Sequence, residues 1–262
     1  MLTSLQNPFV KQIRKLQSAK ERREQNLFLL EGTHLIESAC LVDYPLVGVC
    51  CTEQWQANHQ SLWENLLLKA ERIEIVTNEV LSAIATTVNP DGVVATARKA
   101  PQAKLPCTGL LLALETVQDP GNLGTIIRTC AAAGASGLWL SSNSVDLDHP
   151  KVLRASAGQW FRLPMAISSD LVATCLECQK SGMQIVATTS TASLTYWELD
   201  YLRPTLILLG NEGAGLSTQL LAISDKQVSI PLSSHVESVN VAIAAALLLY
   251  EAQRQQNFSI NL

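Results

Sequence analysis

The sequence contains no apolar run long enough to cross a membrane. Its most apolar helix candidate, VAIAAALLLY at residues 241–250, has half of the roughly 20 residues that a membrane helix needs. The first 23 residues carry charges throughout and have no apolar core, so we expect no secretory signal there. With 262 residues, of which 47% are hydrophobic, the chain is expected to form one large or two ordinary globular domains, with no membrane as a partner.

The cysteines fit neither a disulfide framework nor a metal site. Their number, seven, is odd and they are scattered along the chain, which favours a reducing compartment, so we expect a cytoplasmic location. The segment CLEC at residues 175–178 is a single C-x-x-C pair with no second pair to match it. Because a structural zinc site needs four ligands, we predict no bound metal.

An excess of positive charge is also missing, because the formal net charge is −4. That sum argues mildly against a nucleic-acid partner, but the distribution of charge matters more. Residues 1–23 hold six basic side chains against Glu21 alone, which is typical of a helical arm that contacts phosphates and also of an ordinary solvated helix face. The basic residues that we single out as RNA contacts are Lys11, Arg14, Lys15, Arg22 and Arg23.

The pattern of elements changes near residue 104. Before it, four short β-like runs alternate with helix-compatible polar stretches, which indicates a small α/β domain. These runs cover residues 27–32, 46–51, 73–77 and 92–97. The stretch KAPQAKLPCTG has two prolines and little apolar periodicity, which is typical of a linker. We therefore divide the chain into domains of residues 1–104 and 105–262.

The second half alternates regularly between apolar strands and helices, which predicts a mostly parallel sheet with helices on both faces. Ligands bind such sheets at the carboxyl ends of the strands. Three segments with glycine or polar residues fall there, and we call them the first, second and third motif segments. They lie within LETVQDPGNLGTIIRTCAAAGA, LILLGNEGAGLS and VSIPLSSHVESVNVAIAAALLLYE, and we use the names for their central parts, residues 118–129, 210–217 and 230–242.

Each motif segment by itself has a structural explanation, since glycines after a strand are usually turn residues and a serine before an apolar run is usually a helix cap. Arg128 differs, because an arginine among small and aliphatic helix residues indicates a nearby anion. Two familiar nucleotide sites fit poorly: GNEGAG lacks the G-x-G-x-x-G order, and PGNLGTIIR lacks the lysine and hydroxyl of a P-loop. Three such segments at the strand ends of one sheet together indicate a functional site.

The motifs D-P-G-N-L-G-T-I-I-R-T, G-N-E-G-A-G-L and I-P-L-x-x-x-x-E-S-V-N-V-A-x-A-A-A-L-L-L-Y-E, in this order, resemble those of the SpoU/TrmH family of RNA ribose 2′-O-methyltransferases, part of the SPOUT superfamily. The resemblance covers residues 110–254, and the first half resembles the small RNA-binding domain of many relatives. It implies a C-terminal trefoil knot and a homodimer. Relatives usually have glycine at Ser234, and serine is less free to adopt a positive φ, so the path of that loop does not follow from the resemblance.

The resemblance also implies the cofactor and the reaction. S-adenosylmethionine would be bound largely by main-chain atoms, and its methyl group would pass to a ribose 2′-hydroxyl without a metal. The residues implied for the cofactor pocket are Thr188, Leu209, Gly210, Asn211, Gly213, Ile230, Leu232 and Val239. The residues implied for the catalytic cluster are Asn122, Arg128, Glu212, Ser238 and Asn240.

Two of these residues have roles that chemistry constrains. A guanidinium is effectively always protonated, so we assign Arg128 to the phosphate of the target nucleotide and to developing alkoxide charge rather than to a base. In the family this arginine reaches toward the cofactor of the partner subunit. Glu212 is one candidate for the proton acceptor, and the alternative is that it shapes its own loop by accepting backbone amides.

Ribosomal RNA is the expected substrate, because the first half resembles that of rRNA-modifying relatives, and tRNA is the alternative. An RNA-binding protein that kept the fold and lost catalysis would be a different class of function. The presence of all five polar motif residues argues against that class. A nucleotide-dependent oxidoreductase would instead bind NAD and not S-adenosylmethionine.

Overall fold

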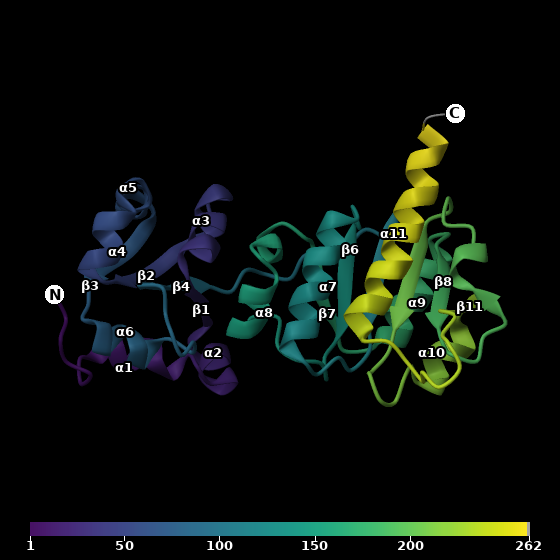
Figure 1. The fold of residues 1–262 in the computed structure, drawn as a ribbon, viewed down its shortest axis with the longest axis horizontal. Helices are drawn as coiled ribbons and strands as arrows, with labels where there is room; N and C mark the ends of the chain where they lie inside the picture. The colour runs from purple at the N-terminus through teal and green to yellow at the C-terminus, as the bar shows by residue number, and fades with distance from the viewer. Residues whose placement is uncertain (261–262) are drawn as a thin grey trace. The chain divides into compact units, whose positions relative to one another are not determined.

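The computed structural model describes the main chain of residues 1–260 and the side chains as far as residue 256. The chain forms two compact units, and most of their helices and strands are labelled in Figure 1. Unit 1 contains Met1–Pro101 together with Asp146–Arg162, and unit 2 contains Gln102–Val145 and the chain from Leu163 onward. No helix within the described residues is long and apolar enough to span a membrane.

Unit 1 is built on a four-stranded mixed sheet with the order β1-β4-β2-β3. Strand β4 is antiparallel to β1 and β2, and β2 is parallel to β3. The strands, close to the four predicted runs, are β1 (Leu27–Glu31), β2 (Leu46–Cys51), β3 (Ala70–Ile75) and β4 (Val93–Arg98). The helices are α1 (Pro8–Lys15), α2 (Ala19–Gln25), α3 (Thr33–Leu41), α4 (Glu53–Asn58), α5 (Gln60–Lys69), α6 (Asn78–Ile84) and α8 (Pro150–Ala155), with the short 3-10 turn η1 (Gln159–Phe161).

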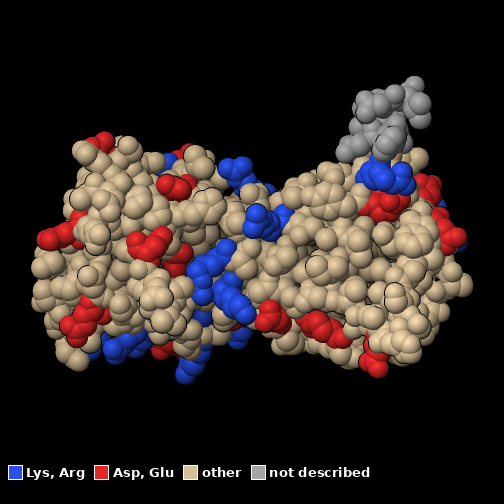
Figure 2. Space-filling view, viewed as in Figure 1, with Lys and Arg blue, Asp and Glu red and all other residues tan. Residues whose placement is uncertain are grey.

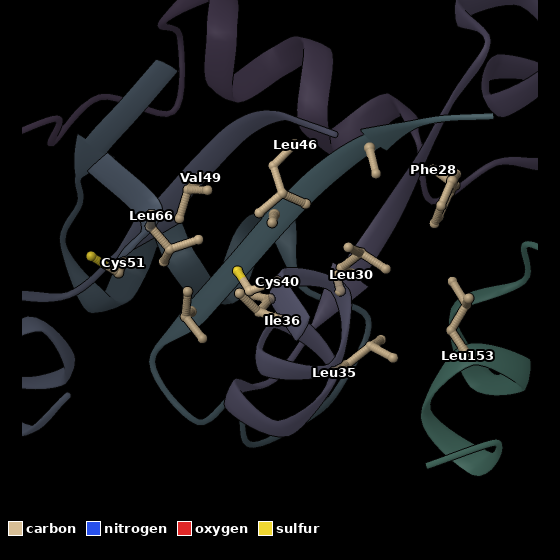
Figure 3. Packing of buried hydrophobic residues seen from close by; sticks show 14 of the residues in the cluster. Phe28, Leu30, Leu35, Ile36, Cys40, Leu46, Val49, Cys51, Leu66 and Leu153 are labelled. Atoms are coloured by element: carbon tan, nitrogen blue, oxygen red, sulfur yellow. The ribbon is translucent and has the colours of Figure 1, made fainter. Parts of the chain in front are cut away.

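Helices bury both faces of the unit 1 sheet. Successive residues of a strand point to opposite faces, so neighbouring residues of β1 pack in different clusters. On β1, Phe28 and Leu30 pack in one cluster with residues of α3 and α5, as Figure 3 shows. Leu27 and Leu29 pack in the other cluster with residues of α1 and α6. This two-layered burial confirms the predicted small α/β fold of the first half.

The segment Asp146–Arg162 belongs to unit 1 although it follows a strand of unit 2 in the sequence. Two buried charged side chains of the first half, Arg22 and Glu31, bind this segment. Arg22, which is 1% exposed, donates to Asp146 Oδ2 at 3.1 Å. Arg154 donates to Glu31 Oε2 in β1 at 2.9 Å. The division at residue 104 placed this segment in the second half, so its packing in unit 1 was not predicted.

Unit 2 contains a seven-stranded sheet with the order β7-β6-β5-β10-β8-β11-β9, and every neighbouring pair is parallel. The strands are β5 (Leu110–Leu114), β6 (Gly137–Ser141), β7 (Met165–Ser168), β8 (Gln184–Thr188), β9 (Leu194–Thr195), β10 (Thr205–Leu209) and β11 (Lys226–Ser229). The helices are α7 (Pro120–Ala132), α9 (Leu171–Lys180), α10 (Thr218–Ile223) and α11 (Val241–Ile260), with the 3-10 turn η2 (Tyr196–Glu198).

Helices cover this sheet on both faces. Leu111 and Ala113 of β5 pack in one cluster with Cys175 and Cys178 of α9, and α10 joins the same cluster. Helices α7 and α11 pack against each other, and Figure 1 shows α11 beside α7 in unit 2. The predicted parallel α/β sheet is confirmed, whereas the trefoil knot stays a prediction. Strand β9 and helix α10 were not predicted, and β9 has only two residues, too few to show a period.

Candidate active site

Helix α7 carries the first motif segment away from the carboxyl end of β5. The Asp119 side chain accepts a hydrogen bond from the Asn122 amide nitrogen at 2.8 Å, and Pro120 occupies the first turn, so both residues favour a helix start here. Ile126 and Ile127 are buried against the unit. Arg128, next in sequence, is exposed, and within the described chain no hydrogen bond or ion pair engages its guanidinium. The helix therefore presents this cation to an external group.

Three of the five predicted catalytic residues form one chain of hydrogen bonds. Asn122 donates through Nδ2 to Glu212 Oε1 at 2.9 Å, and Asn240 donates through Nδ2 to Asn122 Oδ1 at 3.0 Å. Asn240 in turn accepts from the Ala242 amide nitrogen at 2.9 Å at the start of α11. One residue from each motif segment thus meets at this site. Ser238 is exposed in the loop before α11, and no hydrogen bond in the described part of the chain joins it to the others.

The second motif segment forms a tight loop after β10. Asn211 Oδ1 accepts from the amide nitrogens of Gly213 at 2.9 Å and Ala214 at 3.0 Å. The main chains of Asn211 and Gly215 pair with each other. A Cβ added at Gly210 would lie 2.2 Å from the carbonyl carbon of Gly215, so this close approach requires glycine. The Asn211 side chain therefore shapes the loop, and Glu212 accepts from a side-chain amide rather than from backbone amides.

The residues expected for the cofactor pocket lie at the ends of three strands of the same sheet. Leu209 ends β10, Thr188 ends the neighbouring β8, and Ile230 and Leu232 follow β11 on the other side of β8. Ile230, Leu232 and Val239 are half-buried, while Gly213 is exposed main chain. Apolar surface next to bare backbone suits a flat purine nucleoside with polar edges. Among the described residues, no group of three or more His, Cys, Asp or Glu side chains could hold a metal ion.

The loop before α11 contains a strained residue at a position that was not predicted. His235 has a φ of 89°, in the left-handed half of the map that favours glycine. Ser234, where relatives usually have glycine, is not among the described residues with a positive φ. The loop turns at this point with a hydrogen bond from the Val236 amide nitrogen to the Ser233 carbonyl oxygen at 3.1 Å. The glycine-to-serine departure is thus accommodated without strain at the serine.

Three predicted RNA contacts lie together on the outer face of α1. This helix buries Val10 and Ile13 and leaves Lys11, Arg14 and Lys15 exposed. Figure 2 shows basic side chains along the edge of unit 1 where Figure 1 places α1 and α2. The local sequence therefore produces a helix with one apolar face and one cationic face.

Arg22 and Arg23 are placed differently from the other basic residues of the arm. Arg22 is buried, and it donates to Asp146 at 3.1 Å and Asp148 at 3.4 Å, 124 and 126 residues along the chain. The Arg23 side chain is 69% exposed, but it also pairs with Asp146, at 2.8 Å. Because a guanidinium that is 1% exposed cannot reach an RNA phosphate, we leave Arg22 out of the proposed RNA-binding surface.

These ion pairs also set the charge state of Asp146. Burial by itself would raise the pKa of its carboxyl group. The hydrogen bond and the charge of Arg23, with the charges of Arg22 and Lys99, outweigh burial and lower the pKa below its ordinary value of 3.8. The carboxylate form is therefore the one that unit 1 stabilises.

The arrangement of the candidate site in unit 2 is chemically able to orient a hydroxyl group and stabilise charge on its oxygen. Two amides and a carboxylate form an ordered chain of donors and acceptors, and this chain fixes the direction of each side chain. Positioned donors of this kind act on charge that develops in a transition state, and a guanidinium adds a permanent positive charge.

Both halves of the chain match known protein families. Residues 109–250 match the SpoU rRNA Methylase family, and residues 7–95 match the MRM3-like substrate binding domain. A Synechocystis protein named as an uncharacterized tRNA/rRNA methyltransferase is 45% identical over 97% of this chain and 94% of its own length. The 23S rRNA (guanosine(2553)-2′-O)-methyltransferase RlmP of Bacillus subtilis is 32% identical over 95% of this chain and 97% of its own length.

Solved structures give the same result. The AdoMet-bound rRNA methyltransferase from Sinorhizobium meliloti has a TM-score of 0.85 at 32% identity, covering 97% of each chain. The SpoU methyltransferase AviRb from Streptomyces viridochromogenes, in complex with AdoMet, has a TM-score of 0.86 at 28% identity, covering 96% of this chain and 99% of its own. The family match over residues 109–250 and the relatives that span nearly the whole sequence show that this chain belongs to the SpoU rRNA methylase family.

Proposed function

We propose that the protein transfers a methyl group from S-adenosylmethionine to the 2′-hydroxyl of a ribose in ribosomal RNA. The observation that carries this proposal is the hydrogen-bonded chain from Asn240 through Asn122 to Glu212, which joins the three motif segments beside the glycine-rich loop. The RlmP relative is named as a 23S rRNA 2′-O-methyltransferase, and two similar structures contain AdoMet, which supports the same substrate and cofactor here.

The proposed cofactor site is the main chain of the second motif segment together with the half-buried side chains of the third. Leu209, Gly210 and Gly213 would contact the cofactor with backbone atoms, and Ile230, Leu232 and Val239 would cover the purine. Thr188 donates through Oγ1 to the Leu208 carbonyl at 2.9 Å, which fixes the end of β8 beside this site. S-adenosylmethionine supplies an electrophilic methyl group when it is bound.

In this proposal, the polar residues orient the RNA and handle the hydroxyl proton. Arg128 binds the phosphate of the target nucleotide and stabilises negative charge on the attacking oxygen. Glu212 accepts the hydroxyl proton through Oε2, the carboxylate oxygen outside the bond to Asn122. Asn122 and Asn240 hold that carboxylate in place, and Ser238, at the head of α11, contacts the target ribose.

We assign RNA docking to residues 1–104 and methyl transfer to residues 105–262, except for the segment within the second range that packs in unit 1. The match of residues 7–95 to a substrate binding domain and the exposed cations of α1 support this division. The segment Asp146–Arg162, which packs in unit 1, contributes to the docking unit without carrying any motif residue. Lys11, Arg14 and Lys15 contact RNA phosphates in this arrangement, and Arg23 does so in competition with Asp146.

We further propose a homodimer that works in the cytoplasm on ribosomal RNA. On α11, Ile243 is 53% exposed and Tyr250 is 49% exposed. Together with Tyr196 and Leu247 they line a groove of about 420 Å³. A second copy of α11 would cover this apolar surface. In such a dimer the guanidinium of Arg128, which has no partner among the described residues, would reach toward the cofactor site of the second copy.

Calorimetry and a transfer assay test the proposal together. Titration of the full chain with S-adenosylmethionine should show binding, whereas NAD should show none. Labelled methyl groups should then enter 23S rRNA as 2′-O-methyl nucleosides. If the cofactor binds but no methyl group passes to 23S rRNA or tRNA, the protein is an RNA-binding protein without catalysis. Transfer to tRNA alone would overturn the assignment to ribosomal RNA.

A further inference from the structure

Thr116, the second residue after β5, adopts a backbone conformation that β-branched residues rarely take. Its φ is 58°, in the left-handed region that favours glycine, asparagine and aspartate. Three hydrogen bonds hold it there. Its amide nitrogen donates to Ser141 Oγ at 2.8 Å, its Oγ1 accepts from Asn143 Nδ2 at 3.0 Å, and its carbonyl oxygen accepts from Asn211 Nδ2 at 2.9 Å. The surroundings therefore maintain the strained conformation.

Thr116 and the residue before it hold both ends of the second motif segment. Glu115 donates from its amide nitrogen to the Leu209 carbonyl at 2.9 Å, and its Oε2 accepts from the Ser217 amide nitrogen at 2.6 Å. Thr116 holds Asn211, whose Oδ1 organises the turn between these ends. Two consecutive residues thus fix the start, the turn and the end of this loop.

From Thr116 the chain continues through Val117 into the first motif segment, which starts at Gln118. Val117 donates to Ser144 Oγ at 3.1 Å, and Gln118 donates through Nε2 to the Asn143 carbonyl at 2.8 Å, so this stretch is fastened to the loop after β6. Helix α7 then begins, and its Asn122 returns to the second motif segment through Glu212. The contacts thus join the stretch after β5 both to the loop after β6 and to the loop after β10.

We propose that Thr116, clamped by Asn143, is a positioning residue that sets the shape of the loop for S-adenosylmethionine binding; this rests on the proposed function of that loop. If Thr116 relaxed to a negative φ, its carbonyl would turn away from Asn211, and the turn at Gly213 would lose its anchor. The Asn143 side chain prevents this relaxation by holding Oγ1. Neither residue contacts the proposed catalytic chain, and Glu212, which lies in the same loop, keeps its own hydrogen bond to Asn122 at 2.9 Å. We therefore expect the larger effect on cofactor binding and the smaller one on the chemical step.

A rescue experiment tests this assignment. Asn143→Ala removes the clamp, and we expect a rise of about tenfold in the Kd for S-adenosylmethionine, the size of one broken hydrogen bond and a loosened loop. KM for the cofactor should rise in parallel, while kcat at saturating cofactor should stay within about twofold of wild type. Adding Thr116→Gly should restore a Kd within about threefold of wild type. Glycine adopts a φ near 58° without steric strain, so the clamp is no longer needed to keep that conformation.

Ser142→Ala is the matched control, since it changes the exposed neighbour of Asn143, and its Kd should equal that of wild type. Circular dichroism of each variant confirms that the chain is folded. An unchanged Kd in Asn143→Ala, or a double variant that binds as weakly as Asn143→Ala, overturns the positioning role while the proposed function stands. A wild-type chain that does not bind S-adenosylmethionine overturns both.

Discussion

The Asn122 side-chain amide donates to Glu212 Oε1 across 2.9 Å, which joins two residues 90 positions apart in the sequence. Asn122 accepts at the same time from Asn240, 118 positions away. An asparagine side chain has one acceptor and one donor end, so these two bonds fix its orientation. Asn122 is therefore the residue that links the three motif segments.

Replacing Asn122 by aspartate should place two carboxylates in contact. Repulsion between them should raise the apparent pKa of the pair, because one proton is then shared. We expect methyl transfer by Asn122→Asp to fall as the pH rises through this value and to recover partly at lower pH, where a protonated carboxyl can again donate. The measurement is kcat against pH for wild type, Asn122→Asp and Asn122→Ala. A profile for Asn122→Asp that runs parallel to that of Asn122→Ala would contradict the donor role.

Replacing Arg128 by alanine should abolish methyl transfer with little change in the Kd for S-adenosylmethionine, because the guanidinium is assigned to RNA and to developing charge. Arg128→Lys should also lose most activity, since a point charge does not reproduce a planar pair of donors on phosphate. Lys180→Ala, at the exposed end of α9, is the control and should be fully active. A large loss of cofactor affinity in Arg128→Ala would place the side chain at the cofactor instead.

The motif segments could be predicted from the sequence because their signals are local. Asp119 and Pro120 start a helix, and Gly210 permits a close approach of two main chains that a side chain would prevent. The hydrogen bonds between the segments could not be predicted without the family resemblance. Nothing in the residues around Asn122 identifies Glu212 as its acceptor, since the two meet only when β5 and β10 pair.

The basic residues of the N-terminal arm also show that contacts between distant segments could not be predicted from the sequence. Residues 1–23 indicate a basic helical arm, and on α1 the charges are exposed. Arg22 carries the same charge but is buried, because its partners Asp146 and Asp148 arrive from a distant segment. Long-range ion pairs leave no periodic pattern, so the inclusion of Asp146–Arg162 in unit 1 was also missed. The strain at Thr116 was missed for a similar reason, since the three side chains that hold it lie at the end of β6 or in the loops after β6 and β10.

Neutralising Lys11, Arg14 and Lys15 together with glutamine should weaken RNA binding and flatten its dependence on salt. Removing the charge at one phosphate should lower the log–log salt slope by about 0.9 on a duplex and by about 0.7 on a single strand. The modified nucleotide should stay the same, because phosphate contacts position an RNA and do not select a base. Filter binding at several salt concentrations measures the slope. An unchanged slope would mean that this face of α1 is only solvated.

Removing the buried guanidinium should destabilise unit 1 far more than removing its exposed neighbour. Arg22→Ala leaves Asp146 and Asp148 without their buried partner, a loss of about 3–5 kcal/mol in comparable cases. Arg23→Ala removes a guanidinium that is 69% exposed, and ion pairs made by exposed side chains are worth about 0–1 kcal/mol. Urea unfolding of the full chain compares the two variants. Equal midpoints for Arg22→Ala and Arg23→Ala would contradict the burial of Arg22.

Acid should weaken the same cluster. Because the folded-state pKa of Asp146 is below its ordinary value of 3.8, the carboxylate contributes stability at pH values above 3.8. That contribution is lost as the pH falls from 3.8 through the folded-state value. In Arg23→Ala, which lacks the strongest lowering interaction, the loss over this range should be smaller. Thermal unfolding of both proteins between neutral and acidic pH measures the difference.

A charge on the exposed face of α11 should prevent self-association. Ile243→Lys places an ammonium group in the apolar groove that a second copy is proposed to cover. Light scattering after gel filtration should give twice the mass of one chain for wild type and the mass of one chain for Ile243→Lys. Leu68→Lys, on the exposed apolar surface of unit 1, is the control and should behave as wild type. A wild-type protein with the mass of one chain would exclude the homodimer.

The most direct measurement is methyl transfer from S-adenosylmethionine labelled in its methyl group to unmodified 23S rRNA by the purified full chain. The RNA is then digested to nucleosides and analysed by mass spectrometry. Labelled 2′-O-methyl nucleoside at a defined position, absent with Arg128→Ala, is the expected result. Label on a base, or no label in RNA from a protein that binds the cofactor, would contradict ribose 2′-O-methylation by this site.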